Sequence, residues 1–115
     1  MRTYQNIEAK ILDLTEKTKE FAFMNRDQIF ETIAQIVALG DELARFIRDI
    51  DMTIARVERE ALEEAQATKM SASMVSLTIK QRTSSYKADK EWAGRQLTLL
   101  SEMRIAALAA QRNAE

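Results

Sequence analysis

An uninterrupted heptad repeat of apolar residues runs from Ile29 to Ala61. Steps of four and three residues alternate without a slip, and such a 3.5-residue repeat keeps one stripe of a helix facing a partner helix. Gly40 and Ala61 occupy two of the heptad a positions. The other positions of the stripe predict an oligomer seam formed by Ile29, Ile33, Ile36, Leu43, Ile47, Ile50, Ile54 and Val57.

The composition favours helix along the whole chain. Its 115 residues include no proline and two glycines, so little in the sequence interrupts a helix. The length leaves room for one domain. We therefore expect a single helical domain over residues 1–115, with helices at about 3–23, 26–69 and 74–113. The expected fold is all-α: an elongated helical bundle or coiled coil, with a short helix and two long antiparallel helices, that forms a homo-oligomer.

The boundary between the first two helices is marked by a change of phase. The first stripe, Ile7, Ile11, Leu14 and Phe21, does not continue into the heptad repeat that begins at Ile29. Asn25 followed by Gln28 has the spacing of a capping box, which marks a helix start. We expect a short turn near Met24–Asn25, with a continuous helix and a local phase slip as the alternative.

The second helix is too long for the rest of the chain to cover. At about 1.5 Å per residue it spans roughly 65 Å. Its apolar face is wide at first and becomes narrow after Ile50, which favours a multi-helix bundle first and a two-stranded seam later. Because the heptad phase continues through Gly40, we expect the helix to pass through it without a break; the alternative is that residues 40–42 end one helix and cap the next. We also expect a turn near Ser71–Ser73 and a third helix that frays or bends over its polar stretch 80–90.

Charge is distributed unevenly along the chain. Residues 1–68 hold 9 Lys/Arg and 14 Asp/Glu, and residues 69–115 hold 8 Lys/Arg and 4 Asp/Glu. An acidic half joined to a basic half indicates two partners or contacts between protomers.

Several kinds of chemistry lack their usual residues. The chain has no histidine and no cysteine, which removes the common nucleophile–base pairs and most transition-metal sites. No glycine-rich phosphate loop is present. We expect no enzyme activity, no cofactor and no metal. Residues 1–6 lack the apolar stretch of a signal peptide, and no apolar run has the length of a membrane span. We therefore expect a cytoplasmic protein that does not bind membranes.

One segment carries a pattern suited to nucleic acid. Cations and aromatic rings alternate within sixteen residues, where cations neutralise phosphates and rings stack on unpaired bases. The alternative is a solvated basic helix with buried aromatic residues. The candidate set for binding single-stranded DNA is Lys80, Arg82, Tyr86, Lys87, Lys90, Trp92 and Arg95.

The stretch from Ser73 to Asn113 resembles the C-terminal part of UvsY-type recombination mediators of tailed phages. The shared features are a lysine-bearing polar helix, Trp92 near Gly94, leucine-rich turns, and a Ser/Met/Ala-rich tail with spaced arginines. The resemblance covers about a third of the chain, and here an alanine separates the tryptophan from the glycine. Trp92 and Gly94 are also similar to the motif of WXG-type secreted hairpins, where that motif lies in the central turn rather than inside a helix.

The UvsY-type resemblance implies an oligomeric mediator that binds single-stranded DNA and helps to load a recombinase onto DNA coated with single-strand binding protein. We therefore expect a non-enzymatic accessory protein of phage-type recombination or replication, with itself, single-stranded DNA, and a recombinase or a single-strand binding protein as partners. The alternative is a coiled-coil protein–protein adaptor or inhibitor that binds no nucleic acid.

Overall fold

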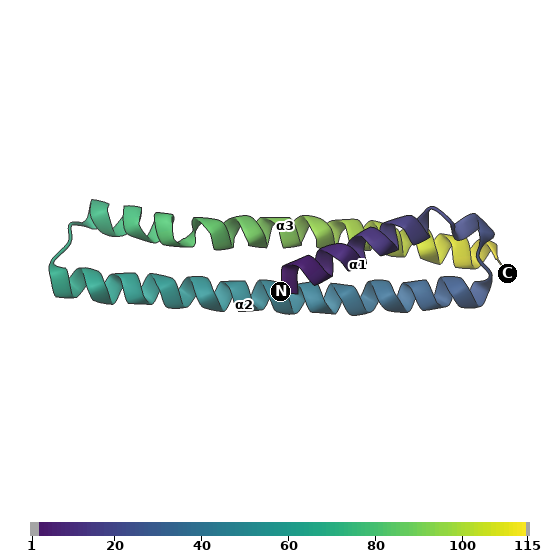
Figure 1. Ribbon diagram of the computed structural model, residues 1–115, viewed down its shortest axis with the longest axis horizontal. Coiled ribbons are helices and arrows are strands. Elements are labelled where there is room, and N and C mark those ends of the chain that lie inside the picture. The colour runs from purple at the N-terminus through teal and green to yellow at the C-terminus, as the bar shows by residue number, and fades with distance from the viewer. Residues whose placement is uncertain (1–2, 115) are drawn as a thin grey trace. The chain divides into compact units, whose positions relative to one another are not determined.

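The protein is described by a computed structural model, which covers residues 3–114. Its elements are α1 (Thr3–Thr18), the short 3-10 helix η1 (Phe21–Phe23), α2 (Arg26–Thr68) and α3 (Ala72–Asn113) (Figure 1). The part of the chain that the structure describes contains no strand. The predicted all-α fold, with one short and two long helices, is confirmed.

The first helix ends earlier than predicted. It was expected to reach Phe23, but α1 stops at Thr18. The backbone then tightens, because the N–H of Lys19 and that of Glu20 each donate to a carbonyl three residues back, at 3.2 and 3.0 Å. The Thr18 hydroxyl also bonds to the Thr15 carbonyl at 2.8 Å. Such i to i+3 bonds close a helix end, and η1 follows as a separate short turn.

The predicted capping box is present at the start of α2. The backbone N–H of Gln28 donates to Asn25 Oδ1 at 2.9 Å, and the backbone N–H of Asn25 donates to Gln28 Oε1 at 2.9 Å. Two N–H groups that have no partner inside the helix are thereby satisfied. The turn at 24–25 excludes the alternative of one continuous helix.

The turn between α2 and α3 is closed by a left-handed residue and a serine cap. Lys69 has a φ of 56°, and the N–H of Met70 reaches back to the Ala65 carbonyl at 3.0 Å, which is the Schellman pattern of helix ends. The Ser71 hydroxyl then accepts a bond from the N–H of Met74 at 3.3 Å. As expected, α2 runs through Gly40 without a break. α3 is helical throughout, including stretch 80–90, where fraying was expected.

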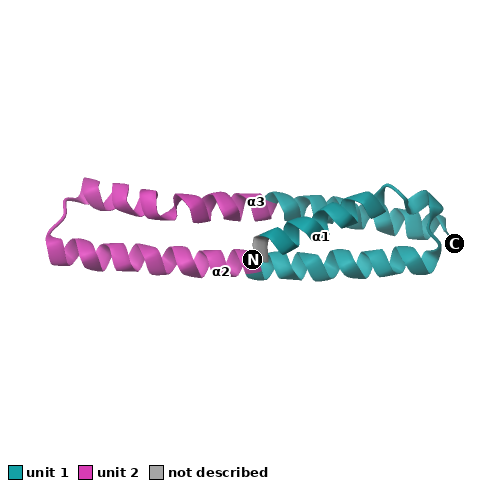
Figure 2. Ribbon diagram, in the orientation of Figure 1, with its two compact units in different colours: residues 1–45, 95–115 teal, residues 46–94 magenta. Residues whose placement is uncertain are grey.

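The chain forms two compact units, and α2 and α3 contribute to both (Figure 2). The three-helix unit comprises residues 1–45 and 95–115, and the two-helix unit comprises residues 46–94. In each unit the segments of α2 and α3 run antiparallel (Figure 1). The apolar face of α2 narrows close to this division. In the three-helix unit α2 packs against two other helices and needs a wide apolar face, whereas in the two-helix unit it packs against α3 alone.

The cores of the two units differ in side-chain size. The three-helix unit buries large aliphatic residues from all three helices: Ile7, Ile11, Leu14, Ile29, Ile36, Leu39, Leu43, Leu100 and Met103. The two-helix unit buries Ile50, Thr83 and small residues, namely Ala61, Ala65 and Ala93. Burial of large apolar groups contributes most to folding, so the three-helix unit is the better stabilised of the two.

The predicted oligomer seam divides between buried and half-buried positions. Its d residues Ile29, Ile36, Leu43 and Ile50 are at most 7% exposed, and they are covered by the chain itself. The last d residue, Val57, and the a residues Ile33, Ile47 and Ile54 are half-buried. A second chain is therefore not needed to shield the d residues from Ile29 to Ile50, whereas Val57 and these a residues remain partly open.

Candidate nucleic-acid interface

The predicted nucleic-acid residues all lie on α3, but in two units. Lys80, Arg82, Tyr86, Lys87, Lys90 and Trp92 belong to the two-helix unit, while Arg95 belongs to the three-helix unit. The four predicted cations that belong to the two-helix unit are exposed, and Tyr86 and Trp92 are half-buried.

Two of these cations are engaged by carboxylates of α2. The Arg82 guanidinium donates to Glu64 Oε2 at 2.9 Å, and Lys90 Nζ lies 2.7 Å from Asp51 Oδ1. The Arg82 hydrogen bond, and then its charge, lower the pKa of Glu64 below its ordinary value. Arg82 and Lys90 therefore tie the two helices together and are less available to phosphate than the sequence indicated.

The two aromatic rings are turned partly into the two-helix unit. Trp92 meets Phe46 of α2 edge-on, with ring centroids 6.3 Å apart and planes at 81°. Such a T-shaped pair stabilises packing by about 0.5–1.5 kcal/mol. Tyr86 is also half-buried. A base could therefore stack only on the outer part of either ring. This agrees better with the alternative stated above, a basic helix with packed aromatic residues, than with open stacking platforms.

Lys80 and Lys87 form the remaining basic face of this unit. Both are exposed, and among residues 3–114 neither has a carboxylate within 4.0 Å. With exposed Ser84 between them, they follow a spacing of four and three, which places all three residues on one face of α3. Glu91 continues the same row, so the positive face is short.

The acidic and basic halves of the sequence neutralise each other inside the two-helix unit. Residues 46–94 contain eight Lys/Arg and eight Asp/Glu. The acidic stretch of α2 runs beside the basic stretch of α3 in antiparallel pairing, and Arg82–Glu64 and Lys90–Asp51 are the direct contacts. The charge asymmetry therefore serves contacts within the chain, whereas the sequence indicated contacts with partners.

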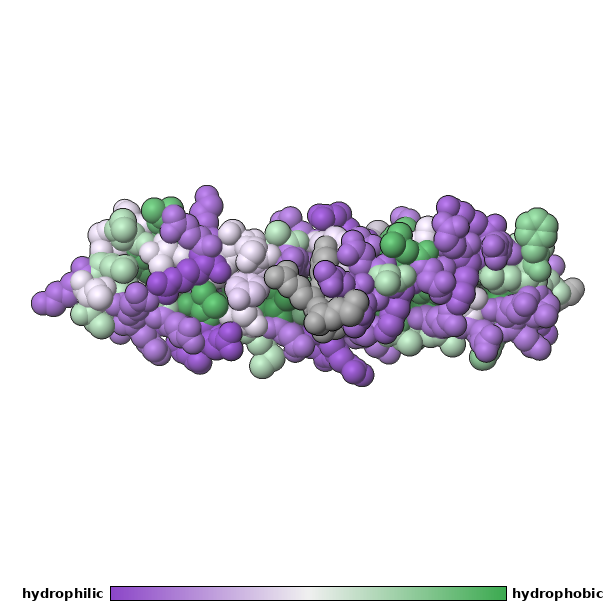
Figure 3. Space-filling view, in the orientation of Figure 1, coloured by the Kyte–Doolittle hydropathy of each residue, from purple (hydrophilic) through white to green (hydrophobic). Residues whose placement is uncertain are grey.

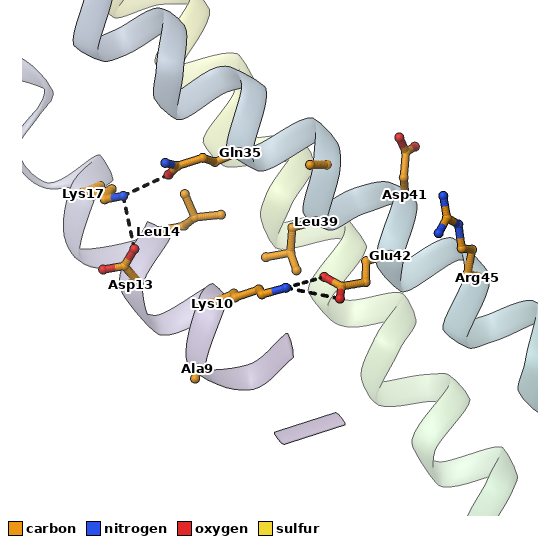
Figure 4. Close-up of a pocket in the computed structure, with 11 residues that line it drawn as sticks. Ala9, Lys10, Asp13, Leu14, Lys17, Gln35, Leu39, Asp41, Glu42 and Arg45 are labelled. Atoms are coloured by element: carbon orange, nitrogen blue, oxygen red, sulfur yellow. Dashed lines mark hydrogen bonds and ion pairs between the residues drawn. The ribbon is translucent and has the colours of Figure 1, made fainter. Parts of the chain in front are cut away.

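Sequence reasoning missed a cavity between α1 and α2 in the three-helix unit, which is lined by both apolar and charged residues. It has a volume of about 720 Å³, with the buried residues Leu14 and Leu39 at its floor (Figure 4). Lys10 lies 3.1 Å from Glu42, and Lys17 bonds to Asp13 at 3.2 Å and to Gln35 at 2.9 Å. These groups satisfy one another and fasten α1 to α2. No spacing signal in the sequence links Lys10 with a residue 32 positions away.

The space-filling view shows polar side chains over much of the face in view, with apolar patches between them (Figure 3). Within residues 3–114 no cluster of acidic residues has the geometry of a metal site. In the same part of the chain, no helix has the length and hydropathy of a membrane span. Comparison with known proteins found no matching family model, no matching curated protein and no matching solved structure.

Proposed function

We propose that this protein is an oligomeric, non-enzymatic helical accessory factor of phage-type recombination or replication, which binds single-stranded DNA in the cytoplasm and assists a recombinase or a single-strand binding protein. The UvsY-type resemblance of residues 73–113 supports the assignment to phage-type recombination or replication. One structural observation supports the DNA contact: Lys80 and Lys87 stand exposed on one face of α3, without a carboxylate partner in the described part of the chain.

The proposal assigns two roles to the four cations that α3 contributes to the two-helix unit, Lys80, Arg82, Lys87 and Lys90. Lys80 and Lys87 contact phosphates, whereas the Ser84 hydroxyl between them donates to the Gln81 carbonyl at 3.3 Å. Arg82 and Lys90 hold α3 against α2 through Glu64 and Asp51. Arg95, exposed on the next part of α3, adds a further phosphate contact.

Two or three phosphate contacts from one chain bind DNA weakly. Each contributes a slope of about 0.7 to the dependence of the logarithm of affinity on the logarithm of salt concentration. Several copies along one strand add their contacts through effective concentration. The proposal therefore requires the protein to act as a multimer on DNA.

The test is a salt-dependent titration of a labelled single-stranded oligonucleotide with the full chain. The variant with Lys80→Glu and Lys87→Glu is expected to bind more weakly, with a salt slope smaller by about 1.4 per chain, because two phosphate contacts are lost. Arg82 is left unchanged, since its loss would also break the bond to Glu64.

A matched control has Arg48→Glu and Arg59→Glu, two exposed α2 residues of the same unit. It changes the net charge equally but leaves the α3 face intact. Equal weakening by both variants would show only a general charge effect. No measurable binding by the wild-type chain at low salt would refute the DNA contact.

The second candidate is a protein–protein adaptor or inhibitor. It is favoured by the carboxylate partners of Arg82 and Lys90 and by the contact of Trp92 with Phe46. These observations use the predicted DNA-binding residues for packing. A chain that binds no oligonucleotide but captures a recombinase or single-strand binding protein of its own phage would support this candidate.

A further inference from the structure

In the three-helix unit α2 carries a second apolar row beside the buried one. Positions d and g of the heptad are buried against the chain's own helices, as Ile36 and Leu39 show. Position e is also apolar but open: Phe30 is 64% exposed, Val37 is 40% exposed, and Ala44 is exposed. The next e residues are Asp51 and Glu58, so this row ends where the three-helix unit ends.

A groove between α2 and α3 lies at the middle of this row, where Val37 lines it. It has a volume of about 210 Å³ and is lined by Ile36, Val37, Gly40, Asp41, Leu97, Leu100, Ser101 and Arg104. The cavity under α1 shares Asp41 with this groove, but its other α2 residues, such as Ala38 and Glu42, differ from those of the groove. At about 100° per residue, Gly40 is about 200° around the helix from Ala38. The groove therefore lies on a side of the α2–α3 pair that α1 leaves uncovered.

Gly40 has no packing reason within this chain. A Cβ atom built on it would meet nothing within 4 Å, and glycine is the poorest helix former after proline. Its missing side chain leaves room for a helix that approaches from outside. Small residues at a helix crossing allow such close approach of two backbones.

The charges on the groove are self-complementary. Asp41 on α2 and Arg104 on α3 are both exposed, and neither has an ion-pair partner within the described residues. In a two-fold symmetric interface, residue i meets residue j, and j meets i. Two copies of this groove can therefore pair Asp41 of each chain with Arg104 of the other.

We propose that a second copy of this chain docks on this groove, with the two α2 helices crossing at Gly40 and the e rows buried between them. This deepens the self-assembly part of the proposed function, and it moves the contact from the d row of the predicted seam to the a and e positions. It concerns mass in solution, so its test is independent of DNA binding.

The test measures the mass of the full chain by sedimentation over a wide concentration range, without DNA. The wild-type chain is expected to dimerise. Val37→Glu is expected to raise the dimer dissociation constant by about tenfold or more, because it buries an unpaired charge. Leu12→Glu is the matched control, since Leu12 is exposed to 65% on α1 and lines neither cavity.

Two further variants guard against loss of folding. Gly40→Leu adds a side chain whose Cβ meets nothing within 4 Å and replaces a poor helix former with a good one, so helicity is retained or raised while dimerisation weakens, and the unfolding midpoint checks that the variant folds. Asp41→Arg and Arg104→Asp each weaken the homodimer, and mixing the two variants restores a heterodimer. Restoration only when both changes are in one chain would place the pair within one chain and overturn the interface.

The outcomes separate this inference from the proposed function. A wild-type monomer at every concentration overturns the dimer and leaves the groove to a different partner. A wild-type oligomer that Val37→Glu and Gly40→Leu leave unchanged overturns this interface but keeps self-assembly. A chain that dimerises as expected but binds no DNA would refute the proposed DNA contact and leave the proposed interface intact.

Discussion

The guanidinium of Arg82 on α3 donates a 2.9 Å hydrogen bond to Glu64 on α2, across the two-helix unit. This bond, and the attraction between the two charges, lower the pKa of Glu64 and raise that of Arg82. A residue predicted to contact DNA therefore fastens a helical hairpin, and the consequence can be measured through the pH dependence of stability.

The Arg82–Glu64 pair predicts a loss of stability in acid. A carboxylate whose folded-state pKa is lowered stabilises the fold fully above its ordinary pKa, and this contribution disappears as the pH falls through the lowered value. Both side chains are about half exposed, so the effect is small. Glu64→Gln should flatten the acid limb of a plot of unfolding midpoint against pH. Glu63→Gln, at an exposed neighbouring position, is the control, and equal flattening in both variants would contradict the assignment.

The capping box at the start of α2 predicts a stability cost on truncation. Asn25→Ala removes the acceptor for the N–H of Gln28, and such a change costs about 1 kcal/mol. Urea unfolding followed by circular dichroism measures the difference. Gln66→Ala, at an exposed position inside the same helix, should change the free energy of unfolding by no more than about 0.5 kcal/mol. A cost for Asn25→Ala no larger than this control would mean that the cap does not support the helix in solution.

The left-handed residue after α2 predicts a stabilising substitution. Lys69 has a φ of 56°, where a side chain costs about 1 kcal/mol and glycine costs little. Lys69→Gly should raise the free energy of unfolding by about 0.5–1 kcal/mol. Gln81→Gly, inside α3, should lower it by about 1 kcal/mol. If thermal or urea unfolding gave both changes the same sign, the Schellman turn would be wrong.

The core of the three-helix unit predicts a large loss at one heptad position. Leu43 is fully buried, and Leu43→Ala should cost about 2–5 kcal/mol because it removes packed methyl groups and leaves a cavity. Met52 on the same helix is 71% exposed, so Met52→Ala should cost no more than about 0.5 kcal/mol. Similar costs for the two in urea unfolding would contradict the burial of the d row by the chain's own helices.

Helices and their ends were readable from local residues. The heptad repeat predicted α2 and its continuation through Gly40, and the Asn25–Gln28 spacing predicted its start. Heptad spacing and capping depend on residues three or four positions apart, so they can be recognised in the sequence alone. The end of α1 was misplaced because the pattern of apolar residues continues to Phe21, while the backbone closes at Thr18 through i to i+3 bonds that leave no mark in hydropathy.

Only the tertiary structure decided which partner each surface has. The sequence by itself determined an all-α chain with a long apolar stripe and opposite charges in its two halves. It could not tell whether Ile36 and Leu43 face another molecule or α3, nor whether Arg82 faces phosphate or Glu64. Burial and ion pairing depend on which residues distant in the chain become neighbours, and antiparallel folding of α3 along α2 sets those neighbours. The open row of Phe30, Val37 and Ala44 became visible only once the other faces of α2 had been filled.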